Sequence, residues 1–109
     1  MEKKAPYYAV IFSSNLKENA DGYAEMASQM NQLAEKQAGF LGLDTARSAD
    51  SHGITVSYWD SLQAIQDWRN NIEHQKAIQK GMTHWYKDYQ VKITRVERAY
   101  EFSMDEEHK

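Results

Sequence analysis

The 109-residue sequence predicts one α+β domain, and three observations support this prediction. Apolar residues recur at helical spacing in residues 23–34 and again in residues 62–85. Runs rich in β-branched and aromatic residues flank and separate these two stretches. A chain of this length can bury one hydrophobic core but not two independent ones, so we expect a single domain over residues 1–109.

The first part of the chain predicts a strand followed by a helix. Residues 7–13, YYAVIFS, are typical of a strand that is buried on both faces, and a polar loop follows them. From Tyr23 onward the apolar positions keep a helical period, which indicates an amphipathic helix; these positions are Met26, Ala27, Met30, Leu33 and Ala34. Gly39 lies just past the end of this helix and is a typical terminator.

A hairpin and a second helical region come next. The hairpin is expected at about residues 40–49 and 53–60, because Asp50-Ser51-His52-Gly53 supplies turn chemistry between them. Either Asp60 or Ser61 can cap the helix that follows. Its apolar stripe consists of Leu62, Ile65, Trp68 and Ile72.

The apolar stripe of this second region changes phase at Asn70-Asn71. Asn70, with Glu73 three residues later, could cap a new helix, so we expect two helical segments with a bend between them. The second segment has its own stripe: His74, Ala77, Ile78, Gly81, Met82 and Trp85.

The last strand is expected at residues 89–102. Its apolar phase flips between Ile93 and Val96, which indicates either a bulge or a strand that serves two different faces. The domain core then covers about residues 6–102, and residues 103–109 form a charged tail.

The resulting order, β-α-β-β-α(α)-β, is that of a ferredoxin-like split βαβ fold, with one antiparallel sheet and helices on one face. The other face keeps apolar and aromatic side chains and should therefore be covered. A second copy of the chain, packed sheet to sheet, would cover it, and the long last strand could reach across to this partner. We therefore expect a homodimer.

Composition excludes several classes of function. The net charge of -3 gives no reason to expect nucleic acid or an anionic membrane surface as a partner. The chain has no cysteine and no apolar run of membrane-spanning length, and MEKKAPYY does not resemble a signal peptide. His74 and His84 are too far apart for an i,i+4 ligand pair, so no metal site is expected. A cytoplasmic location follows by default.

Two stretches accompany this element order, YWDSLQAIQDWRNNIEHQKA and GMTHWYKDYQVKITRVERAYEF. With them, the chain resembles the antibiotic biosynthesis monooxygenase (ABM) domain family over about residues 6–102, and the resemblance implies a dimeric α/β barrel. Its most specific features are the strand end Tyr58-Trp59, then Trp68, then Glu73-His74, and finally Trp85-Tyr86.

The resemblance also implies a kind of site. In the cofactor-independent, quinone-forming oxygenases of the family, a polar side chain near the end of the first strand and a tryptophan on the second helix surround an electron-rich aromatic substrate. Trp68 matches this tryptophan, and Ser13, Ser14 or Asn15 occupies the polar position. The implied substrate-binding set is Ser14, Asn15, Tyr58, Trp59 and Trp85.

The heme-degrading branch of the family fits less well. Its proximal histidine lies about three helical turns beyond the tryptophan, where this chain has Ala77-Ile78-Gln79. His74 comes more than one turn too early for that position. No cofactor is therefore expected.

His74 and Trp68 are the candidate catalytic residues, and each has two interpretations. His74 lies near a helix N-terminus, where the positive partial charge keeps the imidazole neutral and able to take a proton from a phenol. A buried histidine bonded to a backbone carbonyl would give the same pattern. Trp68 could likewise face a ligand or fill the core.

These observations lead to three hypotheses of function. The first is a cofactor-independent monooxygenase that acts on a small aromatic or quinol-like molecule. The second is a non-enzymatic dimer that binds a small ligand or has a stress-related role. The third is a heme-binding and heme-degrading monooxygenase.

Overall fold

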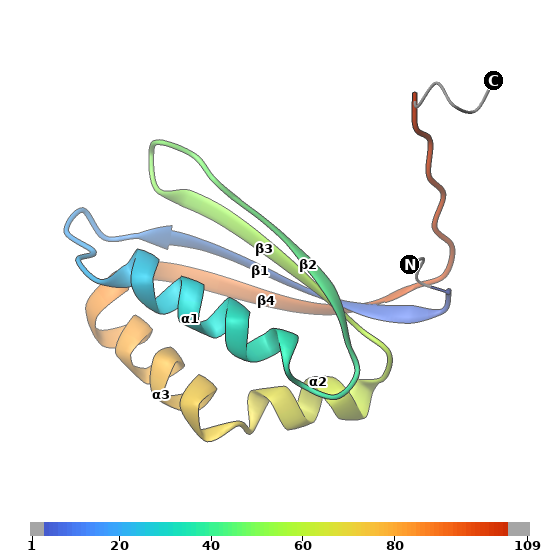
Figure 1. The fold of residues 1–109 in the computed structure, drawn as a ribbon. Helices are drawn as coiled ribbons and strands as arrows, with labels where there is room; N and C mark the ends of the chain where they lie inside the picture. The colour runs from blue at the N-terminus through green and yellow to red at the C-terminus, as the bar shows by residue number, and fades with distance from the viewer. Residues whose placement is uncertain (1–3, 105–109) are drawn as a thin grey trace.

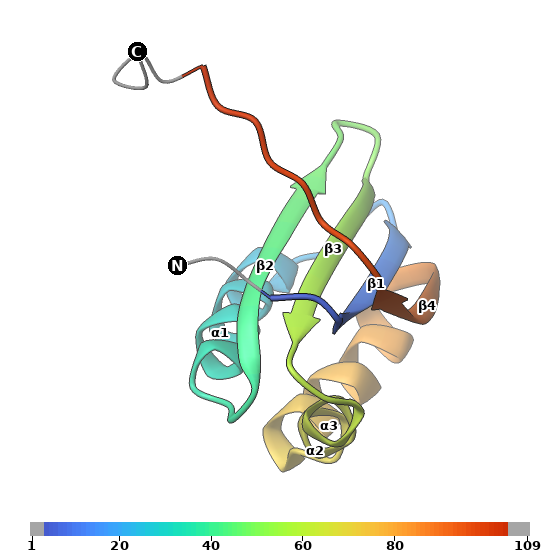
Figure 2. The same cartoon turned by 90° about the vertical axis from the view of Figure 1, so that its right-hand side faces the viewer.

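A computed structural model describes residues 4–104 and shows, within that range, a four-stranded antiparallel sheet with helices on one face (Figures 1 and 2). The predicted ferredoxin-like α+β class is confirmed. The elements are β1 (Tyr7–Leu16), α1 (Tyr23–Glu35), β2 (Phe40–Arg47), β3 (His52–Trp59), α2 (Leu62–Arg69), α3 (Ile72–Lys80), a π-helical turn (Gly81–Trp85) and β4 (Tyr86–Val96).

The helix, the hairpin and the bend after the second helix are found close to their expected positions. Ser61, rather than Asp60, caps α2, and its hydroxyl accepts a hydrogen bond from the Ala64 N–H at 3.0 Å. The prediction that Asn70 caps the next helix is wrong. Asn71 is the cap, because its extended backbone lets its Oδ1 accept from the His74 N–H at 3.1 Å, whereas Asn70 keeps helical angles.

The last strand differs from the prediction at both ends. It begins at Tyr86 and ends at Val96, and residues 97–104 run away from the sheet (Figure 1). Val96 pairs with Tyr7, the first residue of β1, and Pro6 before it has no N–H to continue the ladder. The register shift lies between Asp88 and Tyr86, not between Ile93 and Val96. Most of the charged tail predicted at residues 103–109 lies outside the described range.

The two faces of the sheet differ in an unexpected way. The strand order is β2-β3-β1-β4, and residues directly opposite each other on antiparallel neighbours share a face. Trp59 and Ser57 of β3 pair with Tyr8 and Val10, which pack toward the helices. Val56 and Tyr58, which alternate with Ser57 and Trp59 along β3, therefore point to the open face, as do Ile54 and Ile11. Apart from Trp59, the helix side of β3 carries the hydroxyls of Thr55 and Ser57, whereas its open side carries Ile54, Val56 and the Tyr58 ring.

The main hydrophobic cluster lies at one end of the sheet. Trp59 is completely buried and packs with Ala64 and Ile65 of α2. Partly buried side chains surround this cluster: Tyr8, Val10, Phe40 and Trp68. Large aromatic residues thus supply most of the apolar burial where α2 meets the sheet.

Gly39 holds the junction between α1 and β2 close to the start of α2. Its φ is +87°, and a Cβ at this position would lie 2.5 Å from the Ala64 Cβ and 2.6 Å from an Asp60 carboxylate oxygen. The Gly39 carbonyl also accepts from the Asp60 N–H at 2.8 Å. Glycine is therefore required here both for its backbone conformation and for space.

We predict that Gly39→Ala lowers the free energy of unfolding by about 2–4 kcal/mol, the sum of the left-handed backbone cost and overpacking. Gly22→Ala is the matched control, because Gly22 has φ +89° but its nearest side-chain neighbour would be 3.9 Å away. This control should lose only about 1–2 kcal/mol. Urea denaturation measures both losses, and equal losses in the two variants would contradict the role of the close contact.

Candidate functional site

The candidate site is built on the break between α2 and α3. Asn71 has an extended backbone, φ -61° and ψ 129°, and begins α3 by accepting from the His74 and Gln75 N–H groups. Because the helix does not continue, the Trp68 carbonyl accepts from the Asn71 N–H at 3.1 Å. It also accepts a hydrogen bond from His74 Nδ1 at 3.0 Å.

This hydrogen bond fixes the tautomer of His74. A carbonyl can only accept, so Nδ1 carries the proton and Nε2 of the neutral ring carries the lone pair. Nε2 has no hydrogen-bond partner within residues 4–104. In the same range, every buried side-chain nitrogen or oxygen has a partner. Nε2 therefore faces accessible space. Burial lowers the pKa of His74, and this effect outweighs the opposite effect of the bond to Trp68, so the ring is neutral at pH 7.

Three aromatic rings connect His74 to the core. The imidazole stacks on Trp68 at 4.0 Å between centroids, with an interplanar angle of 15°. Trp68 in turn stacks on Trp59 at 6.1 Å. Trp59 donates its indole N–H to the Ser57 hydroxyl at 2.9 Å. Trp68 thus contacts both the core and the histidine, in keeping with the core interpretation, and its ligand-facing role stays a prediction.

The Ser14 side chain takes part in a different cluster. It is 1% exposed, and its hydroxyl accepts from Arg47 Nη2 at 2.7 Å. Arg47 also donates to the carbonyls of Ser14 and Ser51 and to the Tyr23 hydroxyl. Its guanidinium lies above the backbone of Gly53, where a Cβ would be 2.3 Å from Cζ. All four terminal N–H groups of Arg47 are therefore used to join β1, β2 and α1.

Tyr86 lies beside this polar cluster and packs against several aromatic rings. Its ring lies 5.8 Å from that of Tyr23 and 5.5 Å from those of Phe12 and Tyr89. Burial, followed by the neighbouring Tyr23, raises the pKa of Tyr86 well above its usual range. Tyr86 is consequently a neutral phenol at physiological pH.

The remaining predicted residues lie elsewhere. The Trp85 indole N–H donates to the Asp21 carbonyl at 2.9 Å, beside a hollow of about 230 Å³, and the side chain is 4% exposed. Asn15 points to the open face, where it bonds to His52 and Asp88. Tyr58 is on the same open face and donates to Asp44 at 3.0 Å. Burial and this bond to Asp44 raise the pKa of Tyr58.

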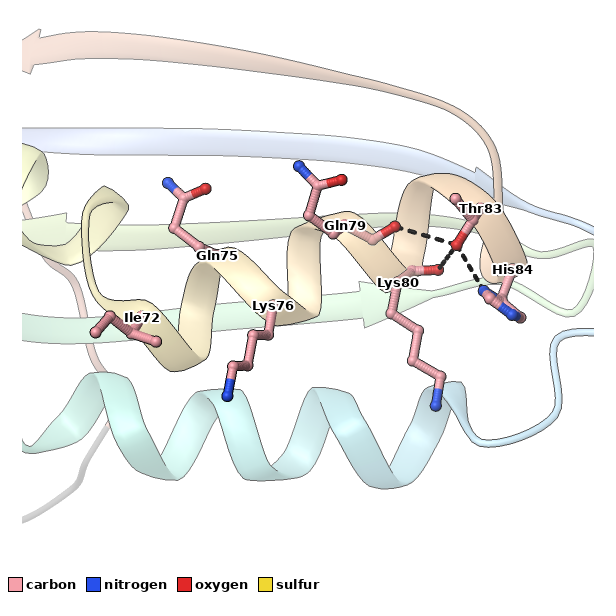
Figure 3. Close-up of a pocket in the computed structure, with 7 residues that line it drawn as sticks. All are labelled: Ile72, Gln75, Lys76, Gln79, Lys80, Thr83 and His84. Atoms are coloured by element: carbon pink, nitrogen blue, oxygen red, sulfur yellow. Dashed lines mark hydrogen bonds between the residues drawn. The ribbon is translucent and has the colours of Figure 1, made fainter.

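The predicted site residues therefore do not share one cavity. Trp59, Trp68 and His74 come together, but Ser14 does not join them. Trp59 pairs with Tyr8 of β1, and Ser14 lies six residues further along that strand, opposite Gly53. At 3.3 Å per residue this places Ser14 about 20 Å from the stacked rings. The larger hollow, about 550 Å³, runs along α3 and is lined by the side chains in Figure 3, none of which belongs to the predicted set.

Arg47, Tyr23 and Tyr86 were missed by the sequence reasoning. Arg47 is the last residue of an ordinary alternating strand, and no spacing motif links it to Ser14 or Tyr23. The available signal was Gly53, a glycine at the start of a strand, which often marks a close approach by another group.

No helix within residues 4–104 is long and apolar enough to cross a membrane. In the same range, no three histidine, aspartate or glutamate side chains gather where they could hold a metal ion. Ala77-Ile78-Gln79, in the region where the resemblance places the ligand of the heme branch, include no histidine, so these residues do not fit heme ligation by that route.

The fold and the aromatic stack define a small ferredoxin-like α+β protein with a histidine stacked on a tryptophan at the break between two helices. The chain belongs to the antibiotic biosynthesis monooxygenase (ABM) family, whose model matches residues 6–80. It is 55% identical over 93 residues to the uncharacterized protein YqjZ of Bacillus subtilis strain 168, covering 85% of this chain and 82% of YqjZ.

Solved structures of low sequence identity share the fold. SnoaB from Streptomyces nogalater, a cofactor-independent oxygenase, has a TM-score of 0.76 at 8% identity, covering 87% of this chain and 97% of SnoaB. Protein SO0527 from Shewanella oneidensis has a TM-score of 0.76 at 11% identity, covering 85% of this chain and 93% of SO0527.

We predict that His74 makes folding stability sensitive to acid. The pKa of His74 is lower in the folded state than its ordinary value of about 6.5. At a pH below that value, the unfolded state therefore binds the proton more readily than the folded state does. The free energy of unfolding should therefore fall more between pH 7.5 and pH 5.5 in the wild type than in His74→Phe. Urea denaturation at both pH values measures this difference. The exposed His84 is the control site, and His84→Gln should behave like the wild type; an equal fall in His74→Phe would contradict the prediction.

Proposed function

We propose that this protein is a cofactor-independent monooxygenase of the ABM type that acts on a small, electron-rich aromatic or quinol-like substrate. The observation that carries the proposal is the fixed tautomer of His74, which leaves Nε2 as a free base beside the Trp68 ring. Family membership and the fold shared with a cofactor-independent oxygenase support the same reaction class.

In the proposed reaction, His74 Nε2 removes a proton from the substrate, and the resulting anion is electron-rich enough to react directly with O2. For a methylene between two aromatic rings, one O2 converts the methylene into a carbonyl and releases one water. The substrate supplies all the electrons, so no external reductant is needed. Trp68 holds the imidazole in place through the stack and through its carbonyl.

We predict that the purified protein accelerates oxygen uptake with anthrones or hydroquinones, and that His74→Ala lowers kcat/KM by about 100-fold, the lower end of what a general base contributes. An oxygen electrode measures the rate above autoxidation. His84→Ala is the control, because His84 is exposed and its ring bonds to Thr83.

The results separate the proposal from its alternatives. Uptake that does not change in His74→Ala would keep the enzyme but remove its base. Absence of uptake across the panel would favour the non-enzymatic ligand-binding dimer. The separation of Ser14 from the stack favours that second candidate.

We also propose that the protein is a homodimer formed through the open face of the sheet. Ile54 on this face is 43% exposed although it is β-branched and apolar. The arm at residues 97–104 carries Tyr100, Phe102 and Met104 at alternate positions, and these are 83%, 86% and 76% exposed. Such side chains normally lie against another surface, and family membership fits a second copy as that surface.

Light scattering after size exclusion should give about twice the 12.7 kDa mass of one chain. Ile54→Glu, or a chain ending at residue 96, should shift the mass toward one copy because each removes apolar contact area. Leu62→Glu is the control, since Leu62 is 55% exposed on α2. A wild-type monomer, or a dimer that only Leu62→Glu disrupts, would contradict the proposed interface.

A further inference from the structure

The helix-side face of β4 is apolar but remains accessible. Val91 is directly opposite Phe12 and Ile93 is directly opposite Val10, so both share the face that carries the helices. Yet Val91 is 43% exposed and Ile93 is 50% exposed. Two β-branched side chains on this face of a sheet would normally be covered by a helix.

The reason is the path of α3. The turn Gly81–Trp85 joins α3 to β4, and Figure 3 shows the two ribbons diverging with distance from that turn. Tyr89, closest to the turn, is half-buried, and exposure is greater at Val91 and Ile93. Gln75 and Gln79 extend from α3 on the side away from α1, toward the ribbon of β1 with β4 beyond it (Figure 3).

This strip, Val91 and Ile93, is continuous with the aromatic site. Val10 packs against the cluster of Trp59, Ala64 and Ile65, together with Trp68. Directly opposite side chains on antiparallel strands have Cβ atoms about 5 Å apart, so Ile93 lies next to this cluster. His74 stacks on the other end of the same group of rings.

We propose that Val91 and Ile93 are specificity-determining residues that contact the flat, apolar, non-reacting part of the substrate, which enters over the edge of β4. The inference rests on the proposed function. A small ligand is the occupant that fits, because two side chains are far less than the roughly 800 Å² per partner of a stable protein interface. Contacts of this kind anchor the ligand while the reacting atoms approach the base.

The test uses Val91→Ser and Ile93→Ser with two readouts. Nile red, a neutral flat dye, reports binding without turnover, and each substitution should raise its Kd about fivefold through lost apolar contact. Leu62→Ser is the matched control, since it removes an equally exposed apolar side chain from α2 and should leave the Kd unchanged. With a substrate that the protein oxidises, the Val91→Ser and Ile93→Ser variants should have a higher KM and almost the same kcat as the wild type.

Thermal denaturation confirms that each variant is folded, and light scattering shows whether its mass has changed. No saturable dye binding by the wild type, or the same Kd in all variants, would overturn the proposal. A change of mass in the strip variants would also overturn it by assigning the strip to a protein interface. If the strip variants lose dye binding but the wild type shows no oxygen uptake, the strip is retained as a ligand site and the oxygenase is rejected.

Discussion

The break between α2 and α3 at Asn71 determines how the candidate site is arranged. In an unbroken helix the Trp68 carbonyl would accept from the N–H of residue 72. Asn71 ends that pattern, and the carbonyl instead accepts from the Asn71 N–H and from the His74 ring. One local backbone feature therefore fixes the tautomer of His74, stacks its ring on Trp68 and links both to Trp59 in the core. The chemistry of the site and the attachment of α2 to the sheet depend on the same turn.

The alternation along β3 has a second consequence. Thr55 and Ser57 point to the helices, and the Thr55 hydroxyl bonds to that of Thr45 at 2.8 Å. Ile54 and Val56 point away from the helices. A sheet with this pattern cannot build one continuous apolar core beneath its helices. Its buried residues instead form a cluster around Trp59 at one end and a contact around Trp85 at the other.

Periodicity predicted the elements well because it is a local property. The amphipathic helix, the hairpin and the phase change at the double asparagine all follow from side chains a few residues apart. Capping was harder, because Asn70 and Asn71 offer the same chemistry and only the backbone angles select one of them. Ser14 and Asn15 are adjacent in sequence but point to opposite faces, and only the pairing of β1 with its neighbours decides which face each takes. Arg47 could not be found at all, since its partners come from distant parts of the chain.

The open edge of β4 depends on residues at the far end of α3. Gly81 has no side chain, and this lets the Tyr86 ring lie where a Cβ would be 2.5 Å away. Trp85 is held by the Asp21 carbonyl, and its own carbonyl accepts from the Lys17 N–H at 2.8 Å. With the turn fixed in this way, α3 and β4 diverge from it (Figure 3), and Val91 and Ile93 remain exposed. A fixed anchor at one end of the helix thus leaves the two apolar side chains of β4 uncovered, as the proposed contact with a substrate requires.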